Sequence, residues 1–410
     1  MRAFIRHIIF ASAIPLSAAT AQQSTRLSRA EAIAAAADRG PRLALARADT
    51  ALAGALVASA QAFPNPILSA IYTRDIPRYH VTAEVPLDFL AVRGTRVKSA
   101  EASRLAAQYR FAFNRALLAL EADTTYTRSL AAQAHTVLSR RNAEAADSLR
   151  QMTVARQVAG DASELDVELA TINAGQQANL AAADSITLVS SLLDLQSVIG
   201  MASDRVAIEL SDTLAPHEAF ITSPMGASGL DSTLPVVEAA AALRAADLAL
   251  RLERRSIFGM PGLVFGFDAG DPTRDTNGLL PTVGIALPLP IFNRNKGPIA
   301  VARAEHDRAS AELAIAQVES RAAIIRATRE LRGANARLGR DTLLVASADR
   351  VASMSLSAYR EGAAPLASVL EAQRNAREVL GQYIDDMASA LVAAATLHAL
   401  TRPPSSGSQP

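Results

Sequence analysis

The sequence contains no cysteine and no tryptophan, and its aromatic residues are few, with 6 tyrosines and 11 phenylalanines in 410 residues. The absence of cysteine excludes disulfide bonds, thiolate metal sites and a lipid-bearing N-terminal cysteine. Any membrane attachment must therefore use another part of the chain.

The chain also lacks a charge imbalance and a long apolar run. Without Arg2 and Arg6 it carries 39 basic and 40 acidic residues, and no long basic run occurs. A nucleic acid is therefore not an expected partner. No uninterrupted apolar stretch of about 18 residues follows the N-terminal segment, so a transmembrane helix is not expected.

The first 21 residues have the features of a secretory signal peptide. Arg2 and Arg6 supply positive charge, "IIFASAIPL" is a short apolar run, and Ala19-Thr20-Ala21 fits a cleavage site with small residues. The mature chain is expected to start near Gln22. Two envelope locations remain open, the periplasm and an outer membrane crossed by β-strands.

Two segments of the chain recur about 202 residues later. Pro86 in "EVPLDFLAVRGTRVKSAEA" aligns with Pro288 in "LPLPIFNRNKGPIAVARAE", and Gly160 aligns with Gly362 at the same offset. Gly94 aligns with Gly297 after a slip of one residue. Because the shared offset appears at two distant places in the same order, the sequence indicates a duplicated chain.

Short segments in each half alternate between apolar and polar residues. In "YHVTAEVPL" the apolar positions run from Val81 to Leu87 in steps of two, and "LVFGFDAGD" and "PTVGIALPL" follow the same period. Such alternation predicts strands with one apolar and one polar face. Short, turn-rich connectors after each first strand predict two hairpins.

Long alanine-rich segments have helical periodicity. Steps of three and four connect a seam of mostly small side chains, namely Ala302, His306, Ala309, Leu313, Ala316, Ser320, Ala323 and Ala327. The seam predicts close helix packing in the manner of a coiled coil. A helix from about residue 90 to 155 would be roughly 100 Å long at 1.5 Å per residue.

These patterns divide the chain into a signal peptide (1–21), a first repeat (22–200), a linker between the repeats at the equator of the molecule (201–230), a second repeat (231–398) and a disordered tail (399–410). In the first repeat we expect helices at about 28–61, 90–157 and 163–199, and strands at about 66–74 and 79–87. In the second repeat we expect helices at about 231–257, 297–359 and 364–398, and strands at about 262–270 and 281–289.

Eight aromatic residues fall in or beside the four predicted strands: Phe63, Tyr72, Tyr79, Phe89, Phe258, Phe265, Phe267 and Phe292. Strands favour aromatic residues in general. A second interpretation is a lipid-facing barrel wall with aromatic girdles. Because four strands cannot close a barrel, and lipid tolerates no open strand edge, this interpretation requires several chains.

The pattern resembles the TolC-type outer-membrane efflux factors. The resemblance covers about residues 28–398 and rests on "FPNPIL" (63–68), "LPLPIFNRNKGPIAVARAE" (287–305), "YREGAAPLASVLEAQR" (359–374) and its weaker copy "VAGDASELDVELATINA" (158–174). The "PLPIFNRNKG" element is most similar to the cobalt–zinc–cadmium, CzcC-like branch. Asp88, in place of a second proline, departs from the family pattern.

The resemblance implies a mainly α-helical fold with a small β part. Three chains would form a 12-stranded barrel in outer-membrane lipid, continued by a helical tunnel through the periplasm. It implies a passive export duct that works with a periplasmic membrane-fusion adaptor and an inner-membrane pump of the resistance–nodulation–division type. Divalent heavy-metal cations are the preferred cargo, and drugs or organic toxicants are the alternative.

The resemblance also assigns roles to residues. It places Gly160, Asp161, Gly362 and Pro365 at helix-hairpin tips that close the entrance and dock the adaptor. Glu371 and Asp166 become candidates for constricting carboxylate rings, and the alternative is that both are solvated carboxylates near helix N-termini, where negative charge is favourable. The barrel-to-tunnel joints are Pro86, Gly94, Pro288, Pro290, Asn293 and Gly297.

No catalytic, cofactor-binding or metal site is predicted. The six histidines are scattered without paired spacing, and no nucleophile elbow, phosphate-binding loop or dinucleotide fingerprint occurs. An exported enzyme is therefore the least favoured class. A soluble periplasmic adaptor or coiled-coil scaffold is a further alternative, which explains the helices but not the alternating strands.

Overall fold

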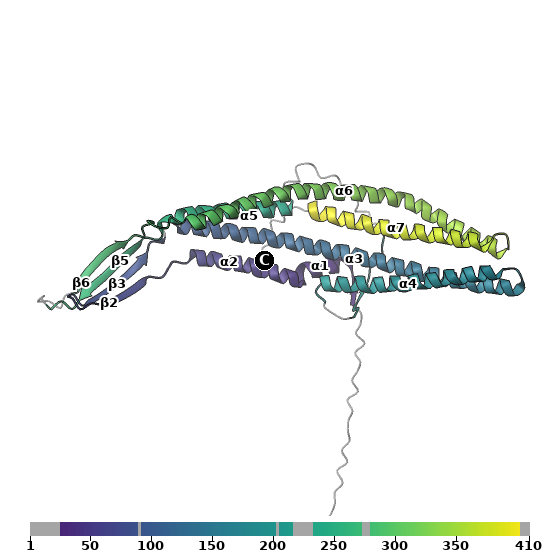
Figure 1. Cartoon of the computed structure of the whole chain (residues 1–410), viewed down its shortest axis with the longest axis horizontal. Helices are drawn as coiled ribbons and strands as arrows, with labels where there is room; N and C mark the ends of the chain where they lie inside the picture. The colour runs from purple at the N-terminus through teal and green to yellow at the C-terminus, as the bar shows by residue number, and fades with distance from the viewer. Residues whose placement is uncertain (1–24, 89–91, 202–204, 216–232, 273–278, 402–410) are drawn as a thin grey trace, which may run out of the picture.

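The computed structural model describes residues 25–88, 92–201, 205–215, 233–272 and 279–401. The molecule is elongated, with a four-stranded sheet at one end and two helix-hairpin turns at the other (Figure 1). The predicted signal peptide, Phe89 and most of the predicted tail lie outside the described residues.

The sheet consists of two antiparallel hairpins joined side by side. Its strands are β2 (Ile67–Tyr72), β3 (Tyr79–Pro86), β5 (Gly262–Ala269) and β6 (Leu280–Ala286), in the order β2-β3-β5-β6. The first hairpin comes from the first repeat and the second from the second repeat. Because β2 and β6 each pair on one side only, the chain by itself leaves two open edges.

The two faces of the sheet differ in chemistry, as the alternation predicts. The register places His80 opposite Asp268 and Thr82 opposite Gly266, so these residues share one face. The other face carries only apolar or aromatic side chains, which are Leu68, Ala70, Tyr72, Tyr79, Val81, Ala83, Val85, Leu263, Phe265, Phe267, Ala269, Pro281, Val283 and Ile285. Most of them are exposed or half-buried, with Val283 at 73%.

Each repeat has one long helix with two shorter helices along it. In the first repeat α3 (Arg93–Ala159, 67 residues) is accompanied by α2 (Pro41–Gln61) and α4 (Glu164–Val198). In the second repeat α6 (Lys296–Arg360, 65 residues) is accompanied by α5 (Leu234–Arg255) and α7 (Leu366–Thr401). A short 3₁₀ turn, η4 (Ser256–Phe258), connects α5 to the sheet.

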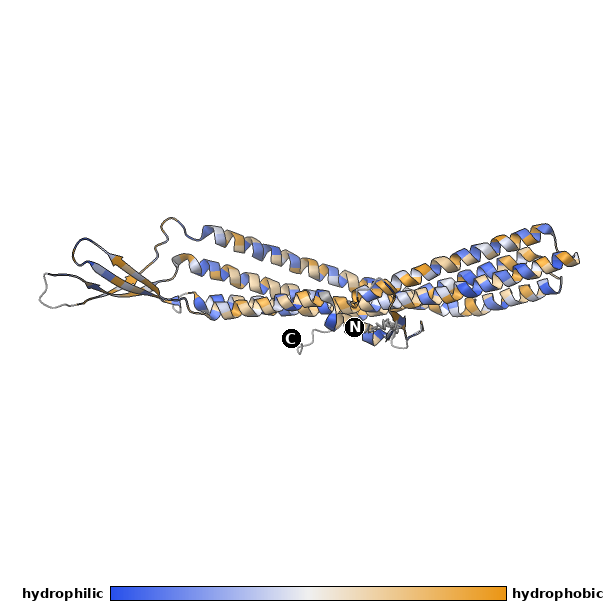
Figure 2. Ribbon diagram, turned by 90° about the horizontal axis from the view of Figure 1, so that it is seen from below, coloured by the Kyte–Doolittle hydropathy of each residue, from blue (hydrophilic) through white to orange (hydrophobic). Residues whose placement is uncertain are grey.

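The seam predicted on α6 is confirmed. Ala302, Ala309, Ser320 and Ala327 are buried, and the other four members are half-buried. Small side chains allow the helix axes to approach closely, and each of them buries little apolar area, so the stabilising contact extends over many turns. Hydrophobic and hydrophilic residues are mixed along the helices (Figure 2).

The helices next to the sheet follow the order of the strands. α2 packs against α3, α3 against α5, and α5 against α6. Farther from the sheet α4 and α7 take the places beside α3 and α6, and α3 also packs against α7. The molecule is therefore a curved wall of helices, with α6 at one edge and α2 or α4 at the other.

A small equatorial unit was not predicted. β1 (Thr25–Leu27) pairs in parallel with β4 (Ile208–Leu210), and α1 (Arg29–Arg39) follows β1. Tyr126 of α3 is fully buried beneath them and donates its hydroxyl hydrogen to Leu27 O or Asp212 Oδ2, both at 2.9 Å. Burial, together with the Asp212 carboxylate, raises the pKa of Tyr126 to about 12.

The structure corrects two sequence-based expectations about helices and linker. The single helix expected over 28–61 is two helices, because Gly40 ends α1 and Pro41 begins α2, where proline needs no helical hydrogen bond. The linker expected over 201–230 contains β4. Residues 216–232 of that linker lie outside the described part.

One helical stretch, Arg29–Gln61, is long and apolar enough to cross a membrane by length and composition. It lies near the N-terminus, it is divided at Gly40, and both of its helices pack against α3. Its apolar residues are accounted for in part by that packing.

Candidate functional site

The first hairpin turn lies between α3 and α4. Gly160 has φ +87°, a left-handed conformation that glycine adopts without strain, and Asp161 N donates to Arg156 O at 2.8 Å. Ser163 then caps α4. The turn exposes Val158 and Leu165, which are 85% and 67% accessible.

The second turn, between α6 and α7, has a similar form. Gly362 has φ +77°, and Ala363 N donates to Ala358 O at 2.8 Å. Pro365 directly precedes α7, and its carbonyl accepts from Ser368 N and Ser368 Oγ at 3.2 and 2.7 Å. Both glycines assigned to hairpin tips therefore occupy tight turns at the same end of the molecule (Figure 1).

Tyr359 joins the two hairpins just behind their turns. Its hydroxyl lies 3.1 Å from Thr153 Oγ1, and the Arg156 guanidinium lies 4.7 Å above its ring. Arg156 also donates to Tyr359 O at 2.5 Å. Tyr359 packs with buried apolar residues from α3, α4 and α7, namely Leu149, Ala170, Leu366 and Val369. These contacts hold the α3–α4 and α6–α7 hairpins together; we call Tyr359, Thr153 and Arg156 the tip clasp.

The carboxylates predicted to constrict the entrance both have local partners. Asp166 accepts from Ser163 N and Ser163 Oγ at 3.1 and 2.8 Å, which completes a capping box at the start of α4. Glu371 forms an ion pair with Arg374 one turn later on α7, at 2.9 Å. The capping box gives Asp166 a local structural role, and Arg374 offsets the charge of Glu371.

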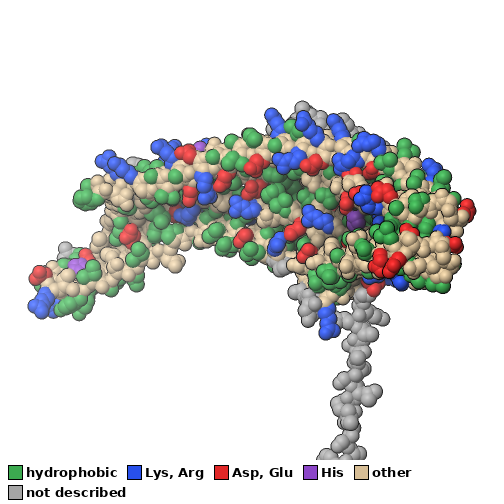
Figure 3. Space-filling view, turned by 45° about the vertical axis from the view of Figure 1, so that its right-hand side comes forward, with side chains coloured by type: hydrophobic (Ala, Val, Ile, Leu, Met, Phe, Trp, Pro, Cys, Tyr) green, Lys and Arg blue, Asp and Glu red, His purple; other side chains and the backbone are tan. Residues whose placement is uncertain are grey.

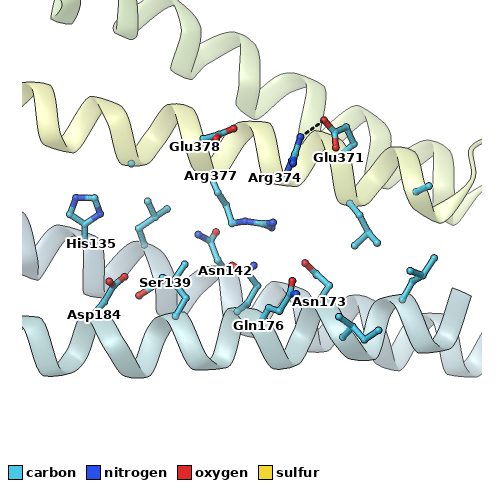
Figure 4. A pocket seen from close by; sticks show the side chains of 18 residues that line it. His135, Ser139, Asn142, Asn173, Gln176, Asp184, Glu371, Arg374, Arg377 and Glu378 are labelled. Atoms are coloured by element: carbon cyan, nitrogen blue, oxygen red, sulfur yellow. Dashed lines mark hydrogen bonds and ion pairs between the residues drawn. The ribbon is translucent and has the colours of Figure 1, made fainter.

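A groove of about 660 Å³ runs between α7 and the α3–α4 pair (Figure 4). Arg377 points into it from α7, and burial together with the Arg374 charge lowers the pKa of the Arg377 guanidinium. On the opposite wall, Asn173 Nδ2 and Gln177 Oε1 are buried without a hydrogen-bond partner among the described residues. The groove is thus polar in its centre.

The first joint between sheet and helices is held by ionic and cation–π contacts. Asp88, which is fully buried, accepts two hydrogen bonds from Arg96 at 3.0 and 2.5 Å. The Arg93 guanidinium lies 4.3 Å above the Phe63 ring. Pro86 ends β3, and Gly94 lies in the first turn of α3 with open space around it. Asp88, which stands where the family pattern has a second proline, therefore supplies the carboxylate that binds Arg96.

The second joint is built from the polar cluster after Pro288 and Pro290. Asn295 N donates to Asn293 Oδ1 at 3.0 Å, and Asn295 itself adopts φ +57°. Its amide donates to Glu253 O and Glu253 Oε2, both at 2.8 Å. Gly297 lies in the first turn of α6. Asparagine tolerates the left-handed conformation, so this turn needs no glycine.

Sequence patterns did not identify the tip clasp, Arg374, or the Asn295–Glu253 contact. The Thr153–Tyr359 contact joins residues 206 positions apart, and the Asn295–Glu253 contact joins residues 42 positions apart. Periodicity carries no information on such pairs. Within the described ranges, no group of three or more His, Asp or Glu side chains could hold a metal ion.

Comparison with known proteins agrees with this geometry. The chain is 25% identical over 347 residues to the cobalt-zinc-cadmium resistance protein CzcC of Cupriavidus metallidurans, which covers 83% of this chain and 82% of that protein. The fold is similar to crystal structures of CusC, with a TM-score of 0.76, 17% identity and 92% of each chain covered. VceC of Vibrio cholerae also gives a TM-score of 0.76, at 18% identity, covering 92% of this chain and 96% of VceC.

The second repeat also matches a family model. Residues 236–401 match the family described as "Outer membrane efflux protein". The solved structures establish the fold, and the family match gives the class of activity, which is transport through a channel and not catalysis. Over residues 236–401 the chain is thus similar to the outer membrane efflux protein family, and over most of its length its fold is that of CusC and of the outer-membrane protein VceC.

Proposed function

We propose that three copies of this chain close a 12-stranded barrel and a helical tunnel that export divalent heavy-metal cations. The observation that supports the trimer most directly is the sheet, which has one wholly apolar face and two open edges. Unpaired backbone groups cost several kcal/mol each in lipid. Edge pairing of β6 with β2 of the next copy removes that cost.

The helices support the same assembly. The edges of the helical wall expose apolar side chains that have no cover within one chain: Leu45, Leu52 and Leu56 on α2, Ile172 and Ile186 on α4, and Val301, Ile315, Val318, Leu343 and Val351 on α6. Rows of this kind on soluble surfaces mark interaction sites. Contact between α6 of one copy and α2 and α4 of the next would bury both rows.

The partners follow from the two ends of the molecule. The barrel lies in outer-membrane lipid, and the hairpin turns at Gly160–Asp161 and Gly362–Pro365 meet a periplasmic adaptor. Val158 and Leu165 expose apolar surface at the first turn, which suits a protein partner. The adaptor connects the channel to an inner-membrane pump of the resistance–nodulation–division type, which supplies the energy.

Metal cargo is supported by the similarity to CzcC, which is named as a cobalt-zinc-cadmium resistance protein. Organic toxicants are the alternative cargo, because the fold alone does not distinguish them. Charges of both signs are interspersed along the tunnel helices (Figure 3). Glu371 and Asp166 stay predictions as pore-lining residues, and the Glu371–Arg374 pair argues for little net charge at that level.

A deletion strain tests the cargo. We expect it to become sensitive to zinc, cobalt and cadmium, with tolerance restored by the wild-type gene, while sensitivity to a panel of dyes and detergents changes little. Fractionation should recover the protein in the outer membrane as a trimer that dissociates only on heating. Dye sensitivity with unchanged metal tolerance would contradict the metal assignment and favour the organic cargo.

A further inference from the structure

Charge on the four strands is restricted to one sign and one face. Glu84 and Asp268 are the only Asp, Glu, Lys or Arg residues in β2, β3, β5 and β6. The register places Glu84 opposite Val264 and Asp268 opposite His80, on the face that carries the polar residues. In the proposed barrel the apolar face contacts lipid, so both carboxylates face the lumen.

Glu84 is an uncompensated charge in the described structure. Its carboxylate has no hydrogen-bond or ion-pair partner among the described residues. The side chain lies over Gly262, where a Cβ would come within 2.5 Å of Glu84 Oε1. Glycine at position 262 therefore leaves the space that the carboxylate occupies, near the tunnel end of the sheet.

Asp268 lies nearer the far end of the sheet and is held in place. Its Oδ1 atom is 2.7 Å from His80 Nδ1, and its Oδ2 atom accepts from Thr282 Oγ1 at 3.2 Å. Thr73 Oγ1 contacts the other ring nitrogen of His80 at 3.2 Å. Asp268 and Glu84 are four residue pairs apart along β3, or roughly 13 Å at 3.3 Å per residue.

The same face carries larger apolar residues directly opposite the two carboxylates, with Ile67 and Val264 opposite Glu84 and Leu280 opposite Asp268. The other residues around them are mostly small, and both carboxylates are half-buried; the small residues are Ser69, Thr82, Gly266, Thr282, Gly284 and Ala286. At the other end of the molecule Arg374 neutralises Glu371, and Asp166 is occupied in a helix cap. The two carboxylates first considered as constricting rings thus have local partners, whereas Glu84 in the sheet has none among the described residues.

We propose that the barrel sets the ion preference of this channel, through a ring of Glu84 carboxylates and a second ring of Asp268 carboxylates that favour hydrated cations over anions. The inference rests on the proposed trimer, in which each carboxylate occurs three times around the lumen. Rings of one sign of charge concentrate counter-ions and reject co-ions in a narrow, low-dielectric passage.

Reversal potentials of purified trimers in planar bilayers, under a potassium chloride gradient, test the inference. Wild type should prefer cations, and the Glu84→Gln, Asp268→Asn double variant should lower the cation-to-anion permeability ratio by about tenfold. Glu84→Lys should invert the preference. Ser69→Ala, a neutral change on the same face, should leave the ratio unchanged.

Two results separate failure of the inference from failure of the proposed function. Conducting trimers of the double variant with the wild-type ratio would overturn the barrel assignment and leave the channel intact. A wild-type protein that forms no conducting trimer would overturn the proposed function itself. The Glu84 carboxylate has no hydrogen-bond or ion-pair partner in the described part of the chain, so Glu84→Gln and Glu84→Lys test the inference even if Asp268→Asn fails to assemble.

Discussion

At the residue scale, the tip clasp controls how firmly the two hairpins are joined. Tyr359→Phe removes the hydroxyl that lies 3.1 Å from Thr153 Oγ1 and keeps the ring beneath Arg156. A net loss of about 1 kcal/mol is expected for one such hydrogen bond. In the proposed channel, whose entrance these hairpins close, opening should become more frequent and the conductance of single trimers should rise.

Tyr359→Ala should have a larger effect, of about 3–5 kcal/mol, because it also empties a buried site between the hairpins. Tyr109→Phe is the matched control: Tyr109 lies elsewhere on α3 and forms no hydrogen bond within the described chain. Equal conductance in all four proteins would show that Tyr359 does not restrain the entrance.

The roles of residues with a local conformational requirement could be predicted from the sequence. The roles of residues with distant partners could not. Gly160 and Gly362 both adopt positive φ, which their position at the end of a long helical pattern predicts. Tyr359 and Thr153 are 206 positions apart, and nothing near either residue indicates the other. Arg374 was overlooked because the carboxylate at Glu371 was considered without its neighbour one turn later.

At the element scale, the α6–α7 pair contains a proton-sensitive contact. Asp341 and Asp386 are both buried and adjacent, and Arg337 Nε lies 2.6 Å from Asp386 Oδ1. Burial and the Asp386 charge raise the pKa of Asp341. Arg337 and Gln382 hold the pKa of Asp386 below its ordinary value despite its burial.

The two shifts act in opposite directions with pH. The contribution of Asp341 to stability is fully present below the ordinary aspartate pKa of 3.8 and is lost as pH rises through its raised pKa. The contribution of Asp386 is present above 3.8 and is lost as pH falls through its lowered pKa. The helix pair is therefore most stable between the lowered pKa of Asp386 and the raised pKa of Asp341.

Asp341→Asn should raise the melting temperature at pH 7, because a neutral amide replaces a carboxylate beside Asp386. The gain should shrink toward pH 4, because the raised pKa lets wild-type Asp341 bind its proton more readily than an ordinary aspartate as the pH falls. Melting curves by circular dichroism at both pH values provide the measurement, with Asp349→Asn, an exposed change on α6, as control. A gain of equal size at both pH values would contradict the assignment of the raised pKa to Asp341.

Elements with a long, regular pattern were predicted well, and short ones were missed. The α6 seam and the four strands follow from periods that continue over many residues. β1 and β4 have three residues each, too few for a period, and they pair across more than 180 positions. The division at Gly40 and Pro41 had a local signal, since proline favours a first helical turn.

At the scale of the whole molecule, one chain has open edges on its sheet and on its helical wall. The strand order β2-β3-β5-β6 and the helix order α2-α3-α5-α6 agree, so one copy forms a continuous sector of wall from sheet to helices. The duplication explains this shape, because each repeat supplies one strand hairpin and one set of helices. In the proposed trimer, neighbouring copies cover the open edges of the sheet and of the helical wall.

Cross-linking through introduced cysteines tests this closure most directly, because the natural chain has no cysteine to interfere. Ala70→Cys on β2 and Val283→Cys on β6 place thiols on the two open edges, for reaction with a short bismaleimide in isolated outer membranes. Ala83→Cys with Phe265→Cys, directly opposite within one chain, is the control for a folded sheet. Dimer and trimer bands from the edge pair, with only intrachain cross-links in the control, are the predicted result. Monomer alone from the edge pair, with the control still cross-linked, would contradict a barrel closed by three chains.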